Sequence, residues 1–187
     1  MKKIAVLFGL TILSIIATSC DSKGDDSSKE TKIARTISDY SIDFLKNKFD
    51  QVINIEIYLD GDISSELLEL KSEIEKIITE FQEYSGNNIS YQFIDPNKNQ
   101  KTAKALKEQL SNAGLQPSFF ISKKEATEEL REIWPGARIL CGDREEVIQL
   151  LPGGEYATNP GLIQEAVNKL EYKFVTAFWQ LTHKERN

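Results

Sequence analysis

The amino-acid sequence predicts an α/β fold in which a parallel β-α-β unit is followed by antiparallel strands and a C-terminal helix. Apolar and polar residues alternate over residues 53–59 and again over 89–93, as they do in half-buried strands. Between these runs, residues 63–84 carry apolar side chains at steps of three and four, the period of an amphipathic helix. Residues 163–181 repeat that helical period near the end of the chain.

The first elements follow from these patterns. Residues 38–49 (SDYSIDFLKNKF) predict a short amphipathic helix, and residues 51–60 predict a strand with Asn54 and Glu56 on its polar face. A coiled-coil partner could cover the stripe of the long helix, but a helix between two strands usually packs its stripe on its own sheet. We expect that packing for the seven residues of the stripe: Ile63, Leu67, Leu70, Ile74, Ile77, Phe81 and Tyr84.

A second strand and a second helix complete the first half of the domain. The strand is predicted over residues 89–95, and the helix over residues 99–112, with Gly114 after its end. Sequential strands joined through a helix form a parallel pair with a right-handed connection. We therefore expect the strands at 53–59 and 89–95 to be parallel.

The second half of the domain contains shorter apolar runs separated by turn residues, which predicts an antiparallel hairpin system. The predicted segments are a strand at 118–121 that continues through 125–134, a turn at 134–137, and strands at 137–141 and 145–151 joined through Gly142 and Asp143.

A glycine-rich loop leads to the last helix, with Asn159 as its cap and Pro160 at its first position. The apolar stripe of this helix consists of Ile163, Val167, Leu170, Phe174, Ala177 and Leu181. All elements between residues 50 and 183 then fit one layered structure, close to a thioredoxin-like arrangement. We expect a single α/β domain over residues 36–187.

Residues 1–19 predict a signal peptide for export. Lys2 and Lys3 precede an uncharged, mostly apolar run at 4–17, which is shorter than the roughly 20 residues that a membrane span needs. The small residues before Cys20 resemble a bacterial lipobox, although an ordinary cleavage site with a chance cysteine has the same composition. Acylation of Cys20 would hold the mature chain on a lipid bilayer.

Residues 20–35 predict a flexible tether between that anchor and the domain. The segment 21–31 (DSKGDDSSKET) has almost no apolar side chain to bury. Acidic residues directly after the cysteine resemble sorting signals, either for retention at the inner membrane through Asp21 or for surface export in Bacteroidetes-type cells. The expected location is the bacterial cell envelope, on the extracytoplasmic side of the inner or the outer membrane.

Charge and cysteine content argue against a nucleic-acid-binding protein and against a thiol redox enzyme. The formal net charge is −6, and it becomes −8 when residues 1–19 are removed with Lys2 and Lys3, which does not suit a partner of nucleic acid. If Cys20 is acylated, Cys141 has no partner for a disulfide, and the sequence has no CxxC motif. The only histidine is His183, so we interpret Cys141 as a half-buried strand residue and not as a nucleophile.

The loop YLDGD raises the question of a functional site, because Asp60, Gly61 and Asp62 lie between the first strand and the long helix. A thioredoxin-like enzyme has CxxC at this place, and this chain has no sulfur there. An EF-hand beginning at Asp60 would need glycine and glutamate where Ser65 and Lys71 stand. A hydrolase with paired carboxylates would need two acids at a fixed separation in a cleft.

A structural role explains the same loop more simply. Gly61 provides a turn conformation, Asp62 or Ser64 caps the helix, and Glu66 lies favourably in its first turn. We expect no catalytic residue, no cofactor and no bound metal. The strand ends remain a possible ligand or partner loop, formed by Asp60, Gly61, Asp62, Asp95 and Asn97.

Three segments resemble one family in order and spacing. YLDGD, FIDPN and LEYKF, within matching surroundings from 36 to 184, resemble the N-terminal extracytoplasmic domain of GldG-like proteins. These proteins are auxiliary subunits of ABC transporters linked to gliding motility in Bacteroidetes. Members of that family usually begin with a retained membrane helix and continue into a second domain, whereas this chain has a lipobox and stops at Asn187.

The resemblance implies a non-catalytic, substrate-binding-type component that faces the envelope and serves a permease or a motility complex. The alternative is a free-standing lipoprotein that binds a small or glycan ligand. These two functions differ in the surface at the carboxyl ends of the strands, where the first needs an exposed face and the second a concave polar pocket.

Overall fold

The computed structural model describes residues 37–47, 51–124, 127–154 and 158–183. The chain separates into two units, residues 1–33 and residues 34–187, and every described residue belongs to the second. The predicted signal peptide, Cys20 and the tether lie outside the described residues.

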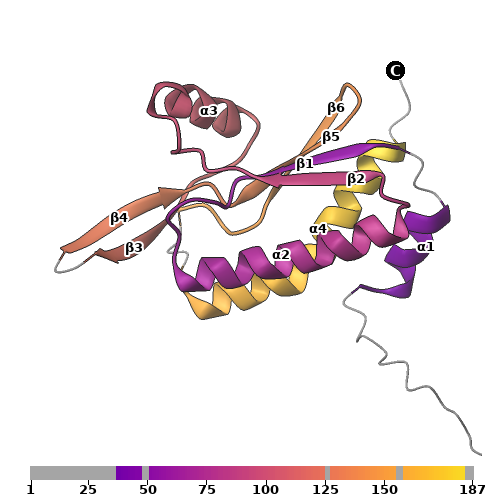
Figure 1. The fold of residues 1–187 in the computed structure, drawn as a ribbon, viewed down its shortest axis with the longest axis horizontal. Coiled ribbons are helices and arrows are strands. Elements are labelled where there is room, and N and C mark those ends of the chain that lie inside the picture. Colours follow the sequence, from indigo (N-terminus) through magenta and orange to yellow (C-terminus); the bar gives the residue numbers. More distant parts are fainter. Residues whose placement is uncertain (1–36, 48–50, 125–126, 155–157, 184–187) are drawn as a thin grey trace, which may run out of the picture. The chain divides into compact units, whose positions relative to one another are not determined.

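Four helices and six strands make up the described part of the chain (Figure 1). In chain order they are α1 (Asp39–Asn47), β1 (Ile53–Ile57), α2 (Ser65–Tyr84), β2 (Ile89–Phe93), α3 (Gln100–Asn112), β3 (Ser118–Lys124), β4 (Thr127–Ile133), β5 (Gly136–Cys141), β6 (Arg144–Gln149) and α4 (Pro160–His183).

The main sheet has four strands in the order β2-β1-β5-β6. β1 is parallel to β2, with Ile53 opposite Ile89, whereas β5 is antiparallel to both β1 and β6. The predicted fold class is therefore confirmed: a thioredoxin-like β-α-β unit is extended by antiparallel strands and followed by a C-terminal helix.

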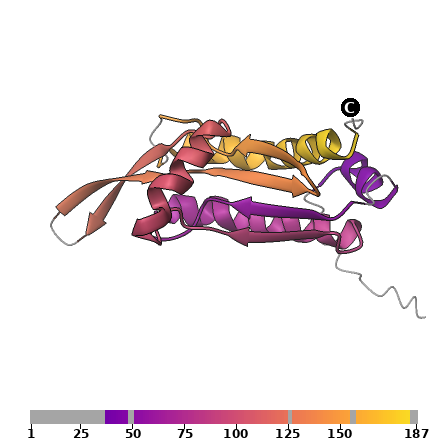
Figure 2. The ribbon, with the colours of Figure 1, turned by 90° about the horizontal axis from the view of Figure 1, so that it is seen from above.

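The predicted helix stripes form the core on one face of this sheet. α2 and α4 lie side by side on that face, and α1 packs at the end of α2 (Figures 1 and 2). Five of the seven stripe residues are buried in the core together with Ile53, Ile55 and Ile57 of β1. The other two, Ile63 and Tyr84, are partly buried and pack against it. Phe81, Phe174 and Phe178 join the two helices through ring contacts with centroids 5.5–6.2 Å apart.

The opposite face of the sheet is covered less completely. Figure 1 shows α3 on this side, away from α2 and α4. α3 is attached through a small apolar cluster, in which its Leu110 packs with Tyr58, Leu115 and Trp134. The rest of this face carries mostly polar side chains, including Asn54 and Glu56 as predicted, with Leu140 of β5 opposite Asn54.

The prediction of one strand through residues 118–134 is wrong. β3 and β4 form an antiparallel hairpin, with Ile121 opposite Leu130, and this hairpin is a separate two-stranded sheet. Its base is held in the core by Phe120 and Ile133, and its far end extends beyond α2 and α4 (Figures 1 and 2). The predicted turn at 134–137 is shorter than expected, because Gly136 and Ala137 already belong to β5.

Candidate functional site

Gly61 is fixed by two independent constraints at the end of β1. Its φ of +95° lies in the region that only glycine adopts readily. A Cβ at this position would lie 2.5 Å from Oδ2 of Asp95, which follows β2. The glycine therefore permits the turn and also lets the two strand ends approach each other, so the predicted turn role of Gly61 is confirmed.

Asp60 is bound by a residue of the long helix. The Lys71 ammonium donates a hydrogen bond of 2.7 Å to Asp60 Oδ1 and lies 4.5 Å from the ring centroid of Phe93. This hydrogen bond holds the pKa of the Asp60 carboxyl below its usual value. Asp60 thus connects the loop to the side of α2.

Asp62 has a partner that lies far away in the sequence. Arg131 Nη1 of β4 is 2.6 Å from Asp62 Oδ2, so an ion pair joins the loop to the hairpin. Ser64, not Asp62, caps α2: its backbone is extended, and its hydroxyl accepts a 3.5 Å hydrogen bond from the Leu67 amide. Of the two predicted caps, Ser64 is the one the structure uses.

Asp95 and Asn97 complete the strand-end cluster. Asp95 Oδ1 accepts a hydrogen bond of 2.8 Å from the Asn97 amide, as in a local turn after a strand. The side-chain amide of Asn97 reaches the backbone carbonyl of Glu132 in β4 at 3.5 Å. Both residues therefore stabilise the place where the β2 end meets the hairpin.

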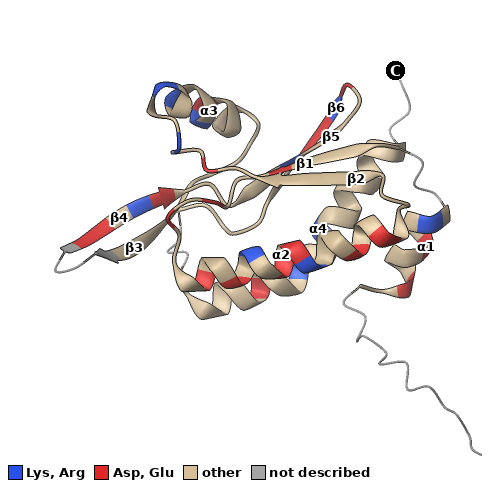
Figure 3. Cartoon of the chain, in the orientation of Figure 1, with Lys and Arg blue, Asp and Glu red and all other residues tan. Residues whose placement is uncertain are grey.

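These side chains surround a cavity of about 230 Å³, which we call the strand-end pocket. Asp60, Asp62, Asp95 and Asn97 line it from the main sheet, and the hairpin contributes Phe120, Arg131, Glu132 and Ile133. Figure 3 shows the basic segment of β4 between acidic ones. The structure thus brings the predicted loop residues together, and it adds a wall that the sequence prediction did not include.

The strand-end pocket is concave and charged, but its acidic groups are largely occupied. Asp60 and Asp62 each bind a cation of the chain, and Glu132 lies 2.9 Å from the Lys107 ammonium. Among the described residues, no three His, Cys, Asp or Glu side chains are placed so that they could hold a metal ion. The pocket can accept a hydrogen-bonding group of a ligand or a partner at its rim.

A second polar network lies on the face of the sheet opposite α2 and α4. Arg138 of β5 binds Glu56 at 3.1 Å and Glu145 at 2.7 Å, and the Tyr58 hydroxyl donates a 2.7 Å hydrogen bond to Glu56. Burial, followed by the bond to Glu56, raises the pKa of Tyr58 to about 12. The hydrogen bond from Arg138 lowers the pKa of Glu145.

Cys141 lies at the other end of the strands from the strand-end pocket. It is the last residue of β5, and its neighbour Leu140 pairs with Asn54 near the start of β1. Its thiol is free and buried, and the Sγ atom lies 3.7 Å from Nη2 of Arg144 and 3.7 Å from Oε1 of Gln51. The prediction of a strand position is confirmed, and the side chain is more deeply buried than expected.

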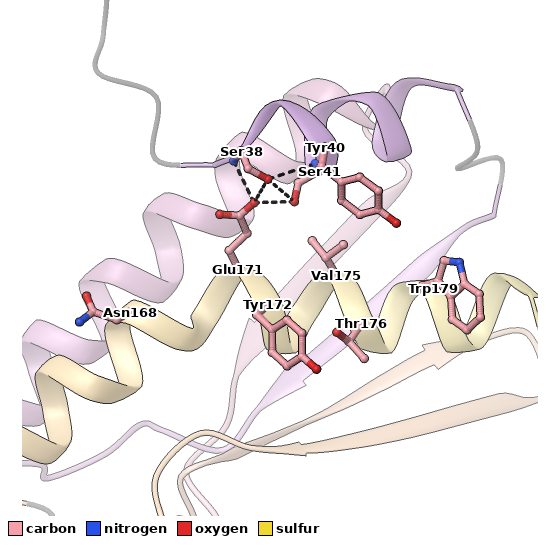
Figure 4. Close-up of a pocket in the computed structure, with 9 residues that line it drawn as sticks. All are labelled: Ser38, Tyr40, Ser41, Asn168, Glu171, Tyr172, Val175, Thr176 and Trp179. Atoms are coloured by element: carbon pink, nitrogen blue, oxygen red, sulfur yellow. Dashed lines mark hydrogen bonds between the residues drawn. The ribbon is translucent and has the colours of Figure 1, made fainter.

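A larger pocket lies between α1 and α4, with a volume of about 410 Å³ (Figure 4). Its lining includes Tyr40 of α1 and Tyr172 and Trp179 of α4. The sequence prediction missed this site because it followed the buried stripe of α4. The missed signal is the spacing of seven residues between Tyr172 and Trp179, which places both rings on one outer side of the helix.

A family model described as a domain of unknown function, DUF7088, matches residues 35–140. The chain belongs to this family. The match extends from α1 to β5, so it contains the strand-end pocket and the hairpin, whereas β6 and α4 follow it. No curated protein and no solved structure matches the chain. Among the described residues, none of the helices has both the length and the apolar character for crossing a membrane.

Proposed function

We propose that the chain is a lipid-anchored, non-catalytic component of the bacterial cell envelope that serves an ABC transporter of the gliding-motility type. The resemblance to GldG-like proteins supports this role, and the lipobox-like sequence before Cys20 supports the anchor. The strand-end pocket adds support, because Asp60 and Asp62 form ion pairs within the chain at the place where a thioredoxin-like enzyme has its reactive thiols.

The observation that carries the proposal is an exposed apolar surface on the hairpin. Ile121 and Leu130 lie opposite each other in the register and are 44% and 62% exposed. Phe119 lies on the same side of the hairpin as Ile121, because side chains two residues apart along a strand share a face. This apolar cross-strand group lies midway along the hairpin, and an exposed apolar group of this kind is typical of a contact surface for another protein.

The position of this surface fits a partner that approaches the strand-end pocket. Arg131 links the hairpin to Asp62, so the hairpin and the predicted partner loop form one continuous area. The hairpin and the loop also lie within the residues that match the family. The proposed partner is the extracytoplasmic part of a permease.

The test is photo-crosslinking in cells, with a crosslinking amino acid in place of Leu130 and, as a control, in place of the exposed Leu68 of α2. We expect position 130 to crosslink to a permease subunit, identified by mass spectrometry, and Ile121→Asp to remove that crosslink. Position 68 should give no such product. Absence of a transporter subunit from the crosslinks at position 130 would contradict the proposed partner.

The anchor needs its own experiment. Cys20→Ala should leave an uncleaved or soluble precursor and remove the incorporation of labelled fatty acid, because the acyl acceptor is gone. If the variant chain still partitions with membranes after its signal peptide has been removed, the lipoprotein assignment is wrong.

The alternative function, a free-standing lipoprotein with a small or glycan ligand, is favoured by two observations. The strand-end pocket is concave and lined mainly by polar side chains, as this function requires at the carboxyl ends of the strands. The pocket between α1 and α4 is lined by exposed aromatic side chains and lies outside the strand-end pocket and the hairpin. This pocket does not exclude a transporter partner, since it and the strand-end pocket share no lining residue in the described part of the chain.

A further inference from the structure

The pocket between α1 and α4 has the character of a binding site for an uncharged, hydroxyl-rich ligand. We propose that it binds a neutral saccharide, with sugar rings placed against the aromatic side chains of Tyr40, Tyr172 and Trp179. Its volume of about 410 Å³ lies within the common range for ligand pockets, roughly 300–1,000 Å³.

The three aromatic side chains are unusually open to solvent. Tyr40 is 71% exposed, Tyr172 73% and Trp179 49%. In Figure 4 they extend from α1 and α4 around Val175 and Thr176. A large ring with one polar atom offers an apolar platform beside a hydrogen-bonding group, and a sugar ring has the matching combination of a C–H face and a hydroxyl rim.

The indole of Trp179 is held in place. The imidazole of His183 stacks on it, with ring centroids 4.9 Å apart and planes inclined by 14°. His183 is in turn held near the backbone carbonyl of Trp179 through Nδ1 at 3.1 Å. A platform with a fixed orientation loses less conformational entropy when a ligand binds.

The charge of the lining selects against anionic ligands. Glu171 is the only carboxylate among its described residues, and the Ser38 amide donates a hydrogen bond of 2.8 Å to this group. The hydroxyls of Ser38 and Ser41 donate two more, as Figure 4 shows. Burial alone would raise the pKa of Glu171, but these hydrogen bonds together lower it by more, so the pKa lies below its usual value. The charged carboxylate therefore links the start of α1 to α4 through these hydrogen bonds.

The remaining groups in the lining are neutral. Asn168 offers an amide and Thr176 a hydroxyl, and none of the described residues lining this pocket is Lys or Arg. Within the described lining, an acidic sugar, a phosphate or an anionic lipid headgroup would therefore find no cation. A neutral saccharide can use both the amide and the hydroxyl.

Two other occupants fit less well. A partner helix needs a mostly apolar groove, whereas the described lining includes the polar residues Ser38, Ser41, Asn168, Glu171 and Thr176. A bilayer surface calls for basic residues around the aromatic ones, and the part of the lining that the structure describes has none. We therefore assign the pocket to a saccharide.

The assignment does not depend on a transporter partner. α4 lies beyond the family match, which ends at Leu140, and the hairpin lies elsewhere on the domain. Failure of the crosslinking experiment at position 130 would leave this inference unchanged, and failure of saccharide binding would leave the crosslinking result unchanged.

The experiment is calorimetric titration of the full-length protein, purified in a detergent without a sugar headgroup. The probes are malto-, cello-, xylo-, manno- and chitotetraose, with tetragalacturonate as an anionic comparison. We expect binding of at least one neutral tetrasaccharide, with a change in tryptophan fluorescence from Trp179. Tyr172→Ala and Trp179→Ala should each weaken the affinity by about three- to tenfold, the effect of losing one aromatic contact.

Matched variants separate the site from general effects on folding. Tyr172→Phe keeps the ring and should retain the affinity within about twofold. Leu68→Ala, at an exposed apolar position on α2 outside the pocket, should leave binding unchanged. The assignment is overturned if no neutral tetrasaccharide binds at about 10 mM, far above the dissociation constant of a weak but specific ligand. It is also overturned if tetragalacturonate binds as well as the neutral probes, or if the two alanine variants bind like wild type.

Discussion

The two faces of the four-stranded sheet are stabilised by different interactions. The face toward α2 and α4 carries Ile53, Ile55 and Ile57 of β1, each at most 1% exposed, and buries them in one continuous apolar core. The opposite face of the same strand carries Asn54 and Glu56, and Glu56 is bound to Arg138 and Tyr58. One strand thus separates an apolar interior from a partly open polar surface.

This difference indicates where stability and where recognition reside. Apolar burial contributes about 1.5–3 kcal/mol for a large side chain, whereas an exposed ion pair contributes about 0–1 kcal/mol. The covered face therefore sets the free energy of unfolding. The exposed side chains of the hairpin and of the outer side of α4 can be replaced at little cost, and residues of these two elements line the candidate pockets.

The largest expected effect is on the covered face. Ile74 is fully buried in the α2 stripe, and Ile74→Asp would place an unpaired charge in the core. We expect a cost of several kcal/mol against a total stability of about 5–15 kcal/mol, which unfolds the domain. Ser72→Asp on the exposed side of the same helix is the control, with a change within about 0.5 kcal/mol. Circular dichroism and thermal melting distinguish the two, and a folded monomer carrying Ile74→Asp would show that the stripe does not face the core.

The next effect concerns the strand end at Gly61. Gly61→Ala and Gly142→Ala both place a Cβ at positive φ, but only the Cβ at Gly61 meets another side chain, Asp95. We expect Gly142→Ala to lower the free energy of unfolding by about 1–2 kcal/mol, because alanine is strained in the left-handed conformation. Gly61→Ala should lose this amount and about 1–2 kcal/mol more, because its Cβ also overlaps with the Asp95 side chain. Denaturant unfolding measures both. Asp95→Ala added to Gly61→Ala should recover the additional loss, and no recovery would mean that the Asp95 contact is unimportant.

The covered face was predictable from the sequence because the physical signal is local. Apolar periods of two and of three to four residues assigned β1, β2, α2 and α4, and Asn159 and Pro160 marked the start of α4. The type of each element follows from neighbours within a few residues. Packing then follows because each apolar stripe has to be buried.

The hairpin and the partner of Asp62 were not predictable in the same way. Residues 122–126 (SKKEA) contain no Gly, Pro, Asn or Asp, so the usual sequence mark of a turn is missing. Asp62 and Ser64 both have side chains that cap helices, but α2 begins directly after Ser64, and Asp62 instead pairs with Arg131. Arg131 is brought to the loop by the tertiary fold, and a single sequence contains no record of that contact.

The polar network at Tyr58 predicts a loss of stability at alkaline pH. The pKa of Tyr58 in the folded chain is about 12, raised from the ordinary value of 10.0. Between these values the unfolded tyrosine releases its proton while the folded one keeps it, so stability falls as the pH rises through this range. Tyr58→Phe should flatten the decline in melting temperature between pH 10 and 12, because the variant has no phenol at this position. The titration of lysines contributes equally to both proteins and does not affect the comparison. Equal slopes for the two proteins would show that the phenol is not held neutral by the fold.

The smallest effects lie in the loop itself and distinguish a cap from an ion pair. Ser64→Ala removes the hydrogen bond to the Leu67 amide and should cost about 0.5–2 kcal/mol. Asp62→Ala removes a partly exposed ion pair with Arg131 and should cost only about 0.2–1 kcal/mol. Salt separates them further, since about 1 M sodium chloride screens the ion pair and leaves the cap hydrogen bond in place. The loss from Asp62→Ala should therefore shrink in high salt while the loss from Ser64→Ala persists.

If both losses are equal and insensitive to salt, Asp62 acts as a second cap and its contact with Arg131 contributes nothing. If calcium raises the melting temperature of wild type but not that of Asp62→Ala, the aspartates bind a cation in preference to Lys71 and Arg131. We expect no such rise, because both carboxylates already have a cationic partner within 2.7 Å.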